Sequence, residues 1–286
     1  MVENRPVIRQ MTRGELDTLV SWAASEGWNP GLNDAEIFWA TDPEAFIAAE
    51  INGEMIGGGS IVSYGGQYGF MGFFIVHPDH RGHGIGNHLW HERLRRLVAR
   101  LDEPVVIGMD GVFEMQAWYA QGGFRSAGRD LRFEHRAAAS TPAARVCDLA
   151  DVPFSQVDAY DQRHFPAPRP EFLKRWIASP GSFACGVVEN DVLAACGVIR
   201  PCVSGYKVGP LFANRPGLAR DVFHALCAEV PGQQVYLDVP EGNADAMALT
   251  ASEGMNEVFG CAKMYYGPAP QLPEHEIYGV TTFELG

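Results

Sequence analysis

Apolar positions in the first half of the chain alternate between the spacing of strands and the spacing of a helix. Apolar runs at residues 45–51 and 55–63 flank Asn52-Gly53, a pair typical of tight hairpin turns. A third run covers residues 69–78, and apolar side chains then recur every three or four positions over residues 90–101, which predicts an amphipathic helix. Three shorter elements complete this half: a strand at residues 105–109, a helix ending at Gly122-Gly123 and a strand at residues 131–135.

The second half repeats this order. Its corresponding elements are apolar runs at residues 183–188, 192–199 and 205–213, a helix carrying Val222, Leu226 and Val230, a strand at 235–239, a helix ending at Gly254 and a strand at 257–266. Repetition of one α/β unit indicates two tandem domains. We place them at residues 1–138 and 143–286, joined by a linker at 137–144 that is rich in Ala, Ser, Thr and Pro.

The C-terminal tail adds one more predicted strand. Residues 267–273 are rich in proline and predict an extended connector, and residues 277–285 favour β-structure. The first repeat has no residues left for a further strand after Arg136. The tail strand therefore has two alternatives: it completes the N-terminal sheet and covers an open edge, or it finishes the sheet of its own half.

Composition narrows the range of partners. The 286 residues are 47% hydrophobic and 20% charged, with a net charge of −13, which argues against nucleic acid or an anionic membrane as a general partner. No apolar run has the length of a membrane span or a signal peptide. The six cysteines form no CxxC pair and predict reduced thiols, so we expect a cytoplasmic protein.

One segment, residues 76–87, combines a strand end, a loop and a helix start. Gly82, Gly84 and Gly86 allow backbone N–H groups to face one point, and the helix start adds its unpaired N–H groups and positive dipole end. This arrangement predicts a binding site for an anion such as a pyrophosphate. The glycines could instead form only a tight turn. The segment lacks the Gly-Lys-Ser/Thr of a P-loop and the GxGxxG of a dinucleotide fold.

The order Arg81-x-x-Gly84-x-Gly86 resembles the [Gln/Arg]-x-x-Gly-x-[Gly/Ala] motif of the GCN5-related N-acetyltransferase (GNAT) superfamily. Tyr119-Ala-Gln-Gly-Gly-Phe124 is similar to the family's Tyr-x-x-x-Gly-Phe, and the resemblance covers residues 6–136. Residues 26–31, 110–112 and 279–286 resemble a group of bacterial tandem-GNAT proteins.

The resemblance implies an α/β (α+β) fold of two GNAT-like domains, each a mixed, mostly antiparallel sheet flanked by helices. The second domain resembles a degenerate copy. Its segment 212–218 has one glycine, and Pro216 removes an N–H group that a phosphate site would use. Thr250 stands where Tyr119 stands in the first half. We therefore expect one acyl-CoA site in each chain, in the first domain.

The resemblance also implies a function and roles for individual residues. We expect acetyl-CoA to be the co-substrate of an N-acetyltransferase that transfers the acyl group directly, in a ternary complex, to a small-molecule amine. Two alternatives remain: the acceptor is a hydroxyl or a thiol, or the protein is a non-catalytic acyl-CoA-binding or sensor protein. Tyr119 would protonate the leaving thiolate, and the N–H of Phe74 would polarise the thioester carbonyl. The expected cofactor-binding residues are Phe74, Ile75, Val76, Arg81, Gly82, His83, Gly84, Ile85, Gly86 and Asn87.

The resemblance implies an acceptor site covered by the first two helices and their loop. We expect Glu26, Trp28, Asn29 and Asp110 to contact the substrate, and the base is Glu26, Asp34 or Asp110.

We expect no metal, because no carboxylates complete the cluster formed by His77, His80, His83, His88 and His91. Tyr119 could be an ordinary core tyrosine. Arg93, Arg95 and Arg96 are expected on a solvated helix face. The second domain could shape the acceptor site or form a homodimer.

Overall fold

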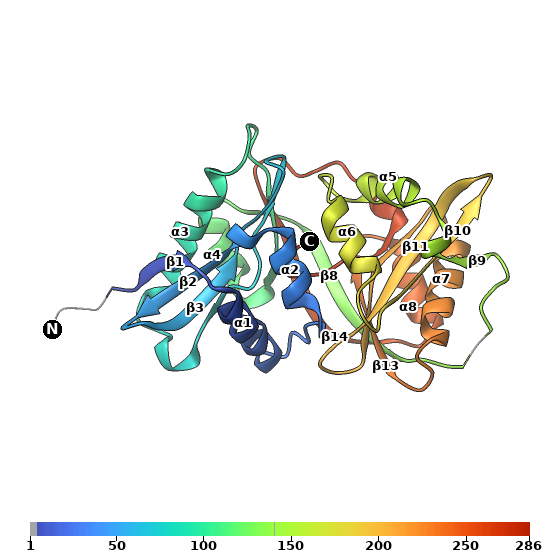
Figure 1. Ribbon diagram of the computed structural model, residues 1–286, viewed down its shortest axis with the longest axis horizontal. Helices are drawn as coiled ribbons and strands as arrows, with labels where there is room; N and C mark the ends of the chain where they lie inside the picture. The colour runs from blue at the N-terminus through green and yellow to red at the C-terminus, as the bar shows by residue number, and fades with distance from the viewer. Residues whose placement is uncertain (1–4, 140) are drawn as a thin grey trace.

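The two halves of the chain lie side by side and share strands at their junction (Figure 1). A computed structural model describes residues 5–139 and 141–286. The described helices are α1 (Arg13–Ser25), α2 (Asp34–Thr41), α3 (Ile85–Val98), α4 (Gln116–Gln121), α5 (Phe154–His164), α6 (Pro170–Ile177), α7 (Pro216–Ala228) and α8 (Ala244–Ser252). The strands in the first half are β1 (Val7–Gln10), β2 (Phe46–Ile51), β3 (Glu54–Ser60), β4 (Val62–Tyr64), β5 (Tyr68–Phe70), β6 (Ile75–Val76), β7 (Ile107–Val112) and β8 (Arg125–Arg136). Those in the second half are β9 (Val146–Asp148), β10 (Phe183–Glu189), β11 (Val192–Pro201), β12 (Tyr206–Ala213), β13 (Gln234–Pro240), β14 (Asn256–Tyr266) and β15 (Ile277–Gly279).

The predicted repeat is confirmed at the level of elements. Each half carries an antiparallel hairpin, β2 with β3 and β10 with β11, followed by a strand, a long helix, a strand, a short helix and a final strand. The pairings are mostly antiparallel, and the parallel pairs are β5 with β7 and β12 with β13. The fold is the mixed α/β arrangement that the sequence predicts.

The final strand of each half pairs with the other half. β14 lies between β7 and β8, and β8 pairs in turn with β13, so the large sheet runs β4-β5-β7-β14-β8-β13-β12-β11-β10-β9. This exchange places β8 and β14 between the two halves (Figure 1). Side chains of the second half therefore reach the strands that follow the glycine-rich segment.

The crossing of the tail strand into the N-terminal sheet is a wrong prediction. Only Ile277–Gly279 forms a strand, and it pairs with β12 of the second half. The edge of β7 is covered instead by β14, so no open edge remains there for the tail. The residues after β15 do reach the first half, because the Tyr64 hydroxyl donates a 2.8 Å hydrogen bond to the Leu285 carbonyl.

The strand predicted over residues 69–78 is interrupted. β5 pairs with β7 in the large sheet, whereas β6 pairs with β3 in a separate sheet of order β1-β2-β3-β6. The four residues between them leave one sheet for the other, and Phe73 takes a positive φ of 51° at this point. The two sheets consequently splay apart between β6 and β7.

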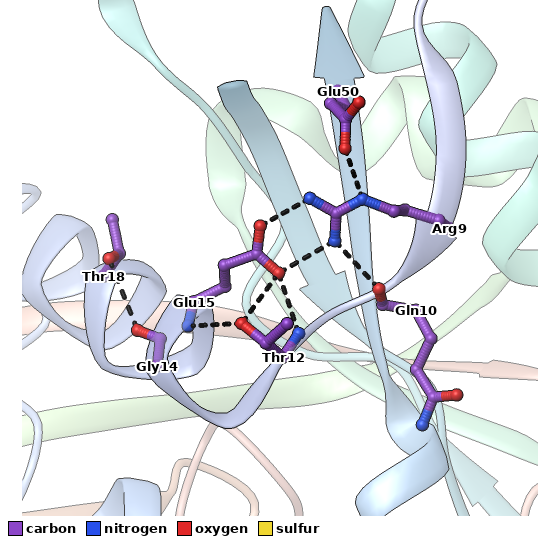
Figure 2. Close-up of polar contacts among 7 residues, drawn as sticks. All are labelled: Arg9, Gln10, Thr12, Gly14, Glu15, Thr18 and Glu50. Atoms are coloured by element: carbon purple, nitrogen blue, oxygen red, sulfur yellow. Dashed lines mark hydrogen bonds and ion pairs between the residues drawn. The ribbon is translucent and has the colours of Figure 1, made fainter. Parts of the chain in front are cut away.

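Helix α1 is fixed at its start by a network of polar side chains (Figure 2). Thr12 caps the helix, and the Glu15 carboxylate accepts a 2.7 Å hydrogen bond from the Thr12 N–H, which completes a capping box. Arg9 donates to both Glu15 and Glu50, so the helix start is tied to β1 and β2. Hydrogen bonds from Arg9 lower the pKa of Glu15 to about 2. This network orients α1, whose C-terminal end carries Glu26 to the edge of the cavity described below.

Candidate functional site

A cavity of about 420 Å³ opens where the two sheets splay apart. Its walls come from the end of α1, the interrupted strand, α3, β7 and α4, and also from β8, β14 and the C-terminal tail. The lining residues that sequence analysis singled out are Glu26, Trp28, Phe74, Ile75, Val76, Arg81, Gly82, Gly86, Asp110 and Tyr119. The structure thus brings most of the predicted cofactor and acceptor residues together around one space.

The glycine-rich segment forms a loop between β6 and α3. The loop runs from His77 to Gly84, and Gly84 is the residue that precedes the first turn of α3. The first N–H groups of a helix have no partner within it, so those of Ile85 and the next residues point towards the loop. The Ile85 side chain is buried in the core, and His83 and Asn87 are exposed beside the loop. At these three positions the backbone, rather than the side chain, faces the potential anion.

The loop leaves room for a phosphate group. Gly82 and Gly84 have φ of 82° and 75°, a conformation that side chains with Cβ disfavour, and a Cβ at either position would meet nothing within 4 Å. Gly86 lies against Phe74 and Val76 of the interrupted strand. The residues present therefore fit a pyrophosphate at the loop and a thin ligand arm running into the cavity.

Tyr119 lies in the cavity wall with only 4% of its surface exposed. Its ring packs against Trp90, with 5.1 Å between the ring centroids, and it covers Gly111 so closely that a Cβ there would collide with the ring. Burial raises the pKa of Tyr119 to about 12, so the hydroxyl keeps its proton at neutral pH. The group can serve as a proton donor.

Asp110 is a partly buried carboxylate in the cavity wall. It sits opposite Lys263 in the β7–β14 pairing, and it also lines a second, smaller cavity of about 60 Å³ that Asp130 and Lys263 share. Burial, followed by the nearby charge of Asp130, raises the pKa of Asp110 well above its ordinary value. A carboxylate of this kind can accept a proton more readily than an exposed one.

Glu26 and Arg81 close one end of the cavity as an ion pair. Arg81 also donates from Nε to the Val76 carbonyl at 2.8 Å. Trp28 lines the cavity, and its backbone carbonyl accepts a hydrogen bond from Arg132. The guanidinium of Arg81 is therefore tied to the end of α1 and to β6, next to the glycine loop.

Asn29 and Asp34 are not among the residues that line the cavity. The Asn29 amide donates 2.9 Å to the Ser204 carbonyl and accepts 2.8 Å from the Ser204 N–H, so it joins the two halves. Asp34 is buried against Arg200, with both carboxylate oxygens 3.1 Å from guanidinium nitrogens. Their role in the structure is to hold the α1–α2 region against the second half.

Sequence analysis missed the walls that come from the second half. Phe259 and Cys261 of β14 and Phe283 and Glu284 of the tail line the cavity, as does Arg132 of β8, a strand of the first half that pairs with the second. No local pattern could find them, because their position depends on the strand exchange.

Sequence analysis also did not identify Arg93 as a cavity residue. Its prediction that Arg93 lies on a solvated helix face is wrong. The side chain is fully buried and lines the cavity. Its spacing, three residues after Trp90 and four before Leu97, puts it on the buried face of α3, and this was the available signal.

The second half has no equivalent of the glycine loop. β12 ends at Ala213 and α7 begins at Pro216, so two residues replace the long loop of the first half. Arg215 at this turn pairs with Glu189. The two halves are therefore not equivalent as anion sites.

Within residues 5–139 and 141–286, no group of three or more His, Cys, Asp or Glu residues could hold a metal ion. The same residues include no helix long and apolar enough to cross a membrane. All six cysteines are free thiols.

Comparison with known proteins gives consistent results. A profile described as the acetyltransferase (GNAT) family matches residues 14–122, and one described as an acetyltransferase (GNAT) domain matches residues 157–279. Holothin acyltransferase of Pseudoalteromonas sp. (strain SANK 73390) is 30% identical over 268 residues, covering 93% of this chain and 89% of that protein.

Two solved structures share the fold of the whole chain. A Pyrococcus horikoshii protein assigned as an acetyltransferase superposes with a TM-score of 0.84 at 21% identity, covering 100% of this chain and 98% of its own. A tandem GNAT protein from the clavulanic acid biosynthesis pathway superposes with a TM-score of 0.65 at 14% identity, covering 93% and 99%. The chain is an acyltransferase of the GCN5-related N-acetyltransferase (GNAT) family, a family that uses acetyl-CoA, and it carries two GNAT domains in tandem.

Proposed function

We propose that the chain is an acetyl-CoA:amine N-acetyltransferase that transfers the acetyl group directly to a small-molecule acceptor. The observation that carries this proposal is the convergence of three parts on one cavity: the open glycine loop, the Tyr119 side chain and the Asp110 carboxylate. The loop supplies an anion site, Tyr119 a proton donor and Asp110 a proton acceptor. An amine acylation needs all three.

The first half would bind the co-substrate. Backbone N–H groups from Gly82 to Asn87 would hold the pyrophosphate, and Phe74 to Val76 would line the arm that carries the thioester. The Phe74 N–H, next to the splay, would donate to the thioester oxygen as negative charge develops on it. Tyr119 would protonate the departing sulfur. Its fit to this role rests on its raised pKa and on its place in the wall.

Asp110 is the best supported of the three candidate bases. An alkyl ammonium has a pKa of about 10.4 and must lose a proton before it can attack. Glu26 is already engaged in an ion pair with Arg81, and Asp34 is paired with Arg200 and does not line the cavity. Asp110 instead has a raised pKa and also lines a second cavity, next to Asp130 and Lys263, into which a proton could pass.

Direct transfer is supported by the state of the cysteine in the cavity wall. An acyl-cysteine intermediate would need a thiolate there. Cys261 is the cysteine among the lining residues, and burial raises the pKa of its thiol well above the ordinary value. The thiol stays protonated at neutral pH and makes a poor nucleophile.

The test incubates the protein with acetyl-CoA and a panel of primary amines and measures turnover as the release of CoA. The wild-type protein should acetylate at least one amine, and Tyr119→Phe should lower kcat by roughly 10²-fold or more, the scale of general acid catalysis. Calorimetry should give one CoA per chain. Tight CoA binding without turnover of any amine, hydroxyl or thiol acceptor would support a sensor instead.

A further inference from the structure

Arg93 is a buried cation whose surroundings in the protein leave it incompletely satisfied. Its side chain is 0% exposed, and its Nη2 donates 2.6 Å hydrogen bonds to the carbonyls of Ser60 and Gly72. Across residues 5–139 and 141–286, Nε and Nη1 have no hydrogen-bond partner. Buried donors without partners are rare, and each one costs free energy.

The contrast with the other buried arginines identifies what is missing. The described residues contain four buried arginines, and three of them pair with a buried carboxylate: Arg132 with Asp238, Arg169 with Asp161 and Arg200 with Asp34. No ion pair with a carboxylate of the described residues is found for Arg93. Burial lowers the pKa of Arg93 to about 9, which still leaves it charged at neutral pH. The Phe74 ring, whose centroid lies 5.3 Å from the Arg93 Cζ atom, offers a cation–π contact, but a buried charge without a counter-ion is still unfavourable.

The position of Arg93 shows where that anion would come from. Gly86, Trp90 and Arg93 follow one face of α3, and all three line the cavity. With a rise of about 1.5 Å per residue, the Cα atom of Arg93 lies about 10 Å further along α3 than that of Gly86. Gly59 makes room for the guanidinium, because a Cβ at that position would collide with its Cζ atom. The arginine therefore lies in the cavity wall beyond the glycine loop, in the same cavity as Tyr119.

We infer that Arg93 binds a carboxylate group carried by one of the two substrates of this cavity. A carboxylate would accept a charge-assisted hydrogen bond from the free donors of the guanidinium and would supply the missing counter-charge. The carboxylate belongs either to the distal end of the acyl group or to the acceptor. This inference rests on the proposed acyl-CoA site. It narrows the substrates to an acidic acceptor for acetyl-CoA, or to an acyl group that carries a carboxylate in place of acetyl.

The first arm of the test uses the acyl group. Malonyl-CoA and isovaleryl-CoA have acyl groups of similar shape, and only the first carries a carboxylate. If the acyl group is the source, calorimetry should show malonyl-CoA binding roughly tenfold to hundredfold more tightly, the scale of a hydrogen bond to a charged group. Arg93→Met should remove this preference and Arg93→Lys should keep part of it. Arg95→Met, on the exposed side of the same helix, is the control and should leave it unchanged.

The second arm uses the acceptor, with CoA already bound. β-Alanine is compared with β-alaninamide, and phenylalanine with phenylalaninamide, by the same measurement. If the wild-type protein binds the acids more tightly than the amides and Arg93→Met does not, the carboxylate belongs to the acceptor. The inference is overturned if the wild-type protein binds the acid and its neutral analogue with equal affinity in every pair of both arms. This outcome can be established with the wild-type protein alone. Binding of CoA itself distinguishes failure of the proposed function from failure of the inference about Arg93. If the wild-type protein does not bind CoA, the proposed function is contradicted and the role of Arg93 is not.

Discussion

The Arg132 guanidinium donates a 2.8 Å hydrogen bond from Nη1 to the backbone carbonyl of Trp28. The same guanidinium holds Asp238 of β13 through Nε and Nη2, at 2.6 and 2.7 Å. One buried side chain on the exchanged strand β8 therefore joins the α1–α2 loop of the first half to the sheet of the second half. It also forms part of the cavity wall.

Removal of this link should destabilise the whole chain. Arg132→Met leaves Asp238 as a buried carboxylate without its partner, a change that typically costs about 3–5 kcal/mol. We expect a clear drop in the midpoint of chemical denaturation. Arg129→Met is the matched control, because Arg129 lies on the same strand and pairs with Glu241 while 51% exposed. Loss of an exposed pair costs about 0–1 kcal/mol, so equal effects of the two variants would contradict this account.

A charge reversal at the loop should abolish binding of CoA. Gly84→Glu places a carboxylate where the phosphate would lie, and we expect affinity measured by calorimetry to fall by at least about a hundredfold. Substitution at a positive φ also strains the backbone. Gly254→Glu controls for that strain, because Gly254 has a φ of 63°, is exposed and also has open space around it. Unchanged affinity in folded Gly84→Glu would remove the loop from the binding site.

Activity should depend on pH through Asp110. A base works in its charged form, and the pKa of Asp110 is raised by burial, so activity should be full above that raised pKa and be lost as the pH falls through it. Asp110→Asn should lower kcat/KM by roughly 10²- to 10⁴-fold and remove this limb of the profile. The same acceptor is used for both proteins, so its own ionisation cancels. Asp17→Asn, at an exposed position on α1, should leave the profile unchanged.

The glycine next to Asp110 should control the position of Tyr119. A Cβ at Gly111 would collide with the Tyr119 ring, so Gly111→Ala should push the ring out of place. We expect kcat to fall by about tenfold or more with little change in the affinity for CoA, since Gly111 does not itself line the cavity. Gly14→Ala is the control, because a Cβ at that position of α1 meets nothing within 4 Å. A normal kcat in Gly111→Ala would argue that Tyr119 acts only in packing.

Local patterns in the sequence predicted the parts of the site that local structure builds. The loop at Gly82–Gly84 follows from glycines between an apolar strand and an amphipathic helix, and the repeat follows from periodicity. The partner of β7 could not be predicted in this way. Residues 131–135 and 257–266 both read as final strands, and nothing local distinguishes pairing within a half from pairing across halves. The walls at Phe259 and Phe283 depend on that choice.

The interruption of the strand at Phe73 could not be predicted from the sequence for a related reason. The segment from Gly69 to Val76 is uniformly apolar, as is expected of a single buried strand, although its two ends pair in different sheets. Apolar periodicity reports burial and not the identity of the neighbouring strand. The positive φ of Phe73 is a consequence of tertiary pairing on both sides.

The strand exchange also predicts how the chain behaves when it is divided. β14 lies between β7 and β8, so residues 1–138 alone would lose the neighbour of β7 and expose an apolar strand edge next to the cavity. We expect this fragment to aggregate or to lack CoA binding. The intact chain carrying a protease site between residues 138 and 143 should behave differently after cleavage. Its two pieces should stay together during gel filtration and should still bind CoA, because β8 pairs with β13 and β14 across the cut. A soluble, monomeric first fragment with full affinity for CoA would show instead that the exchanged strand is dispensable for the site.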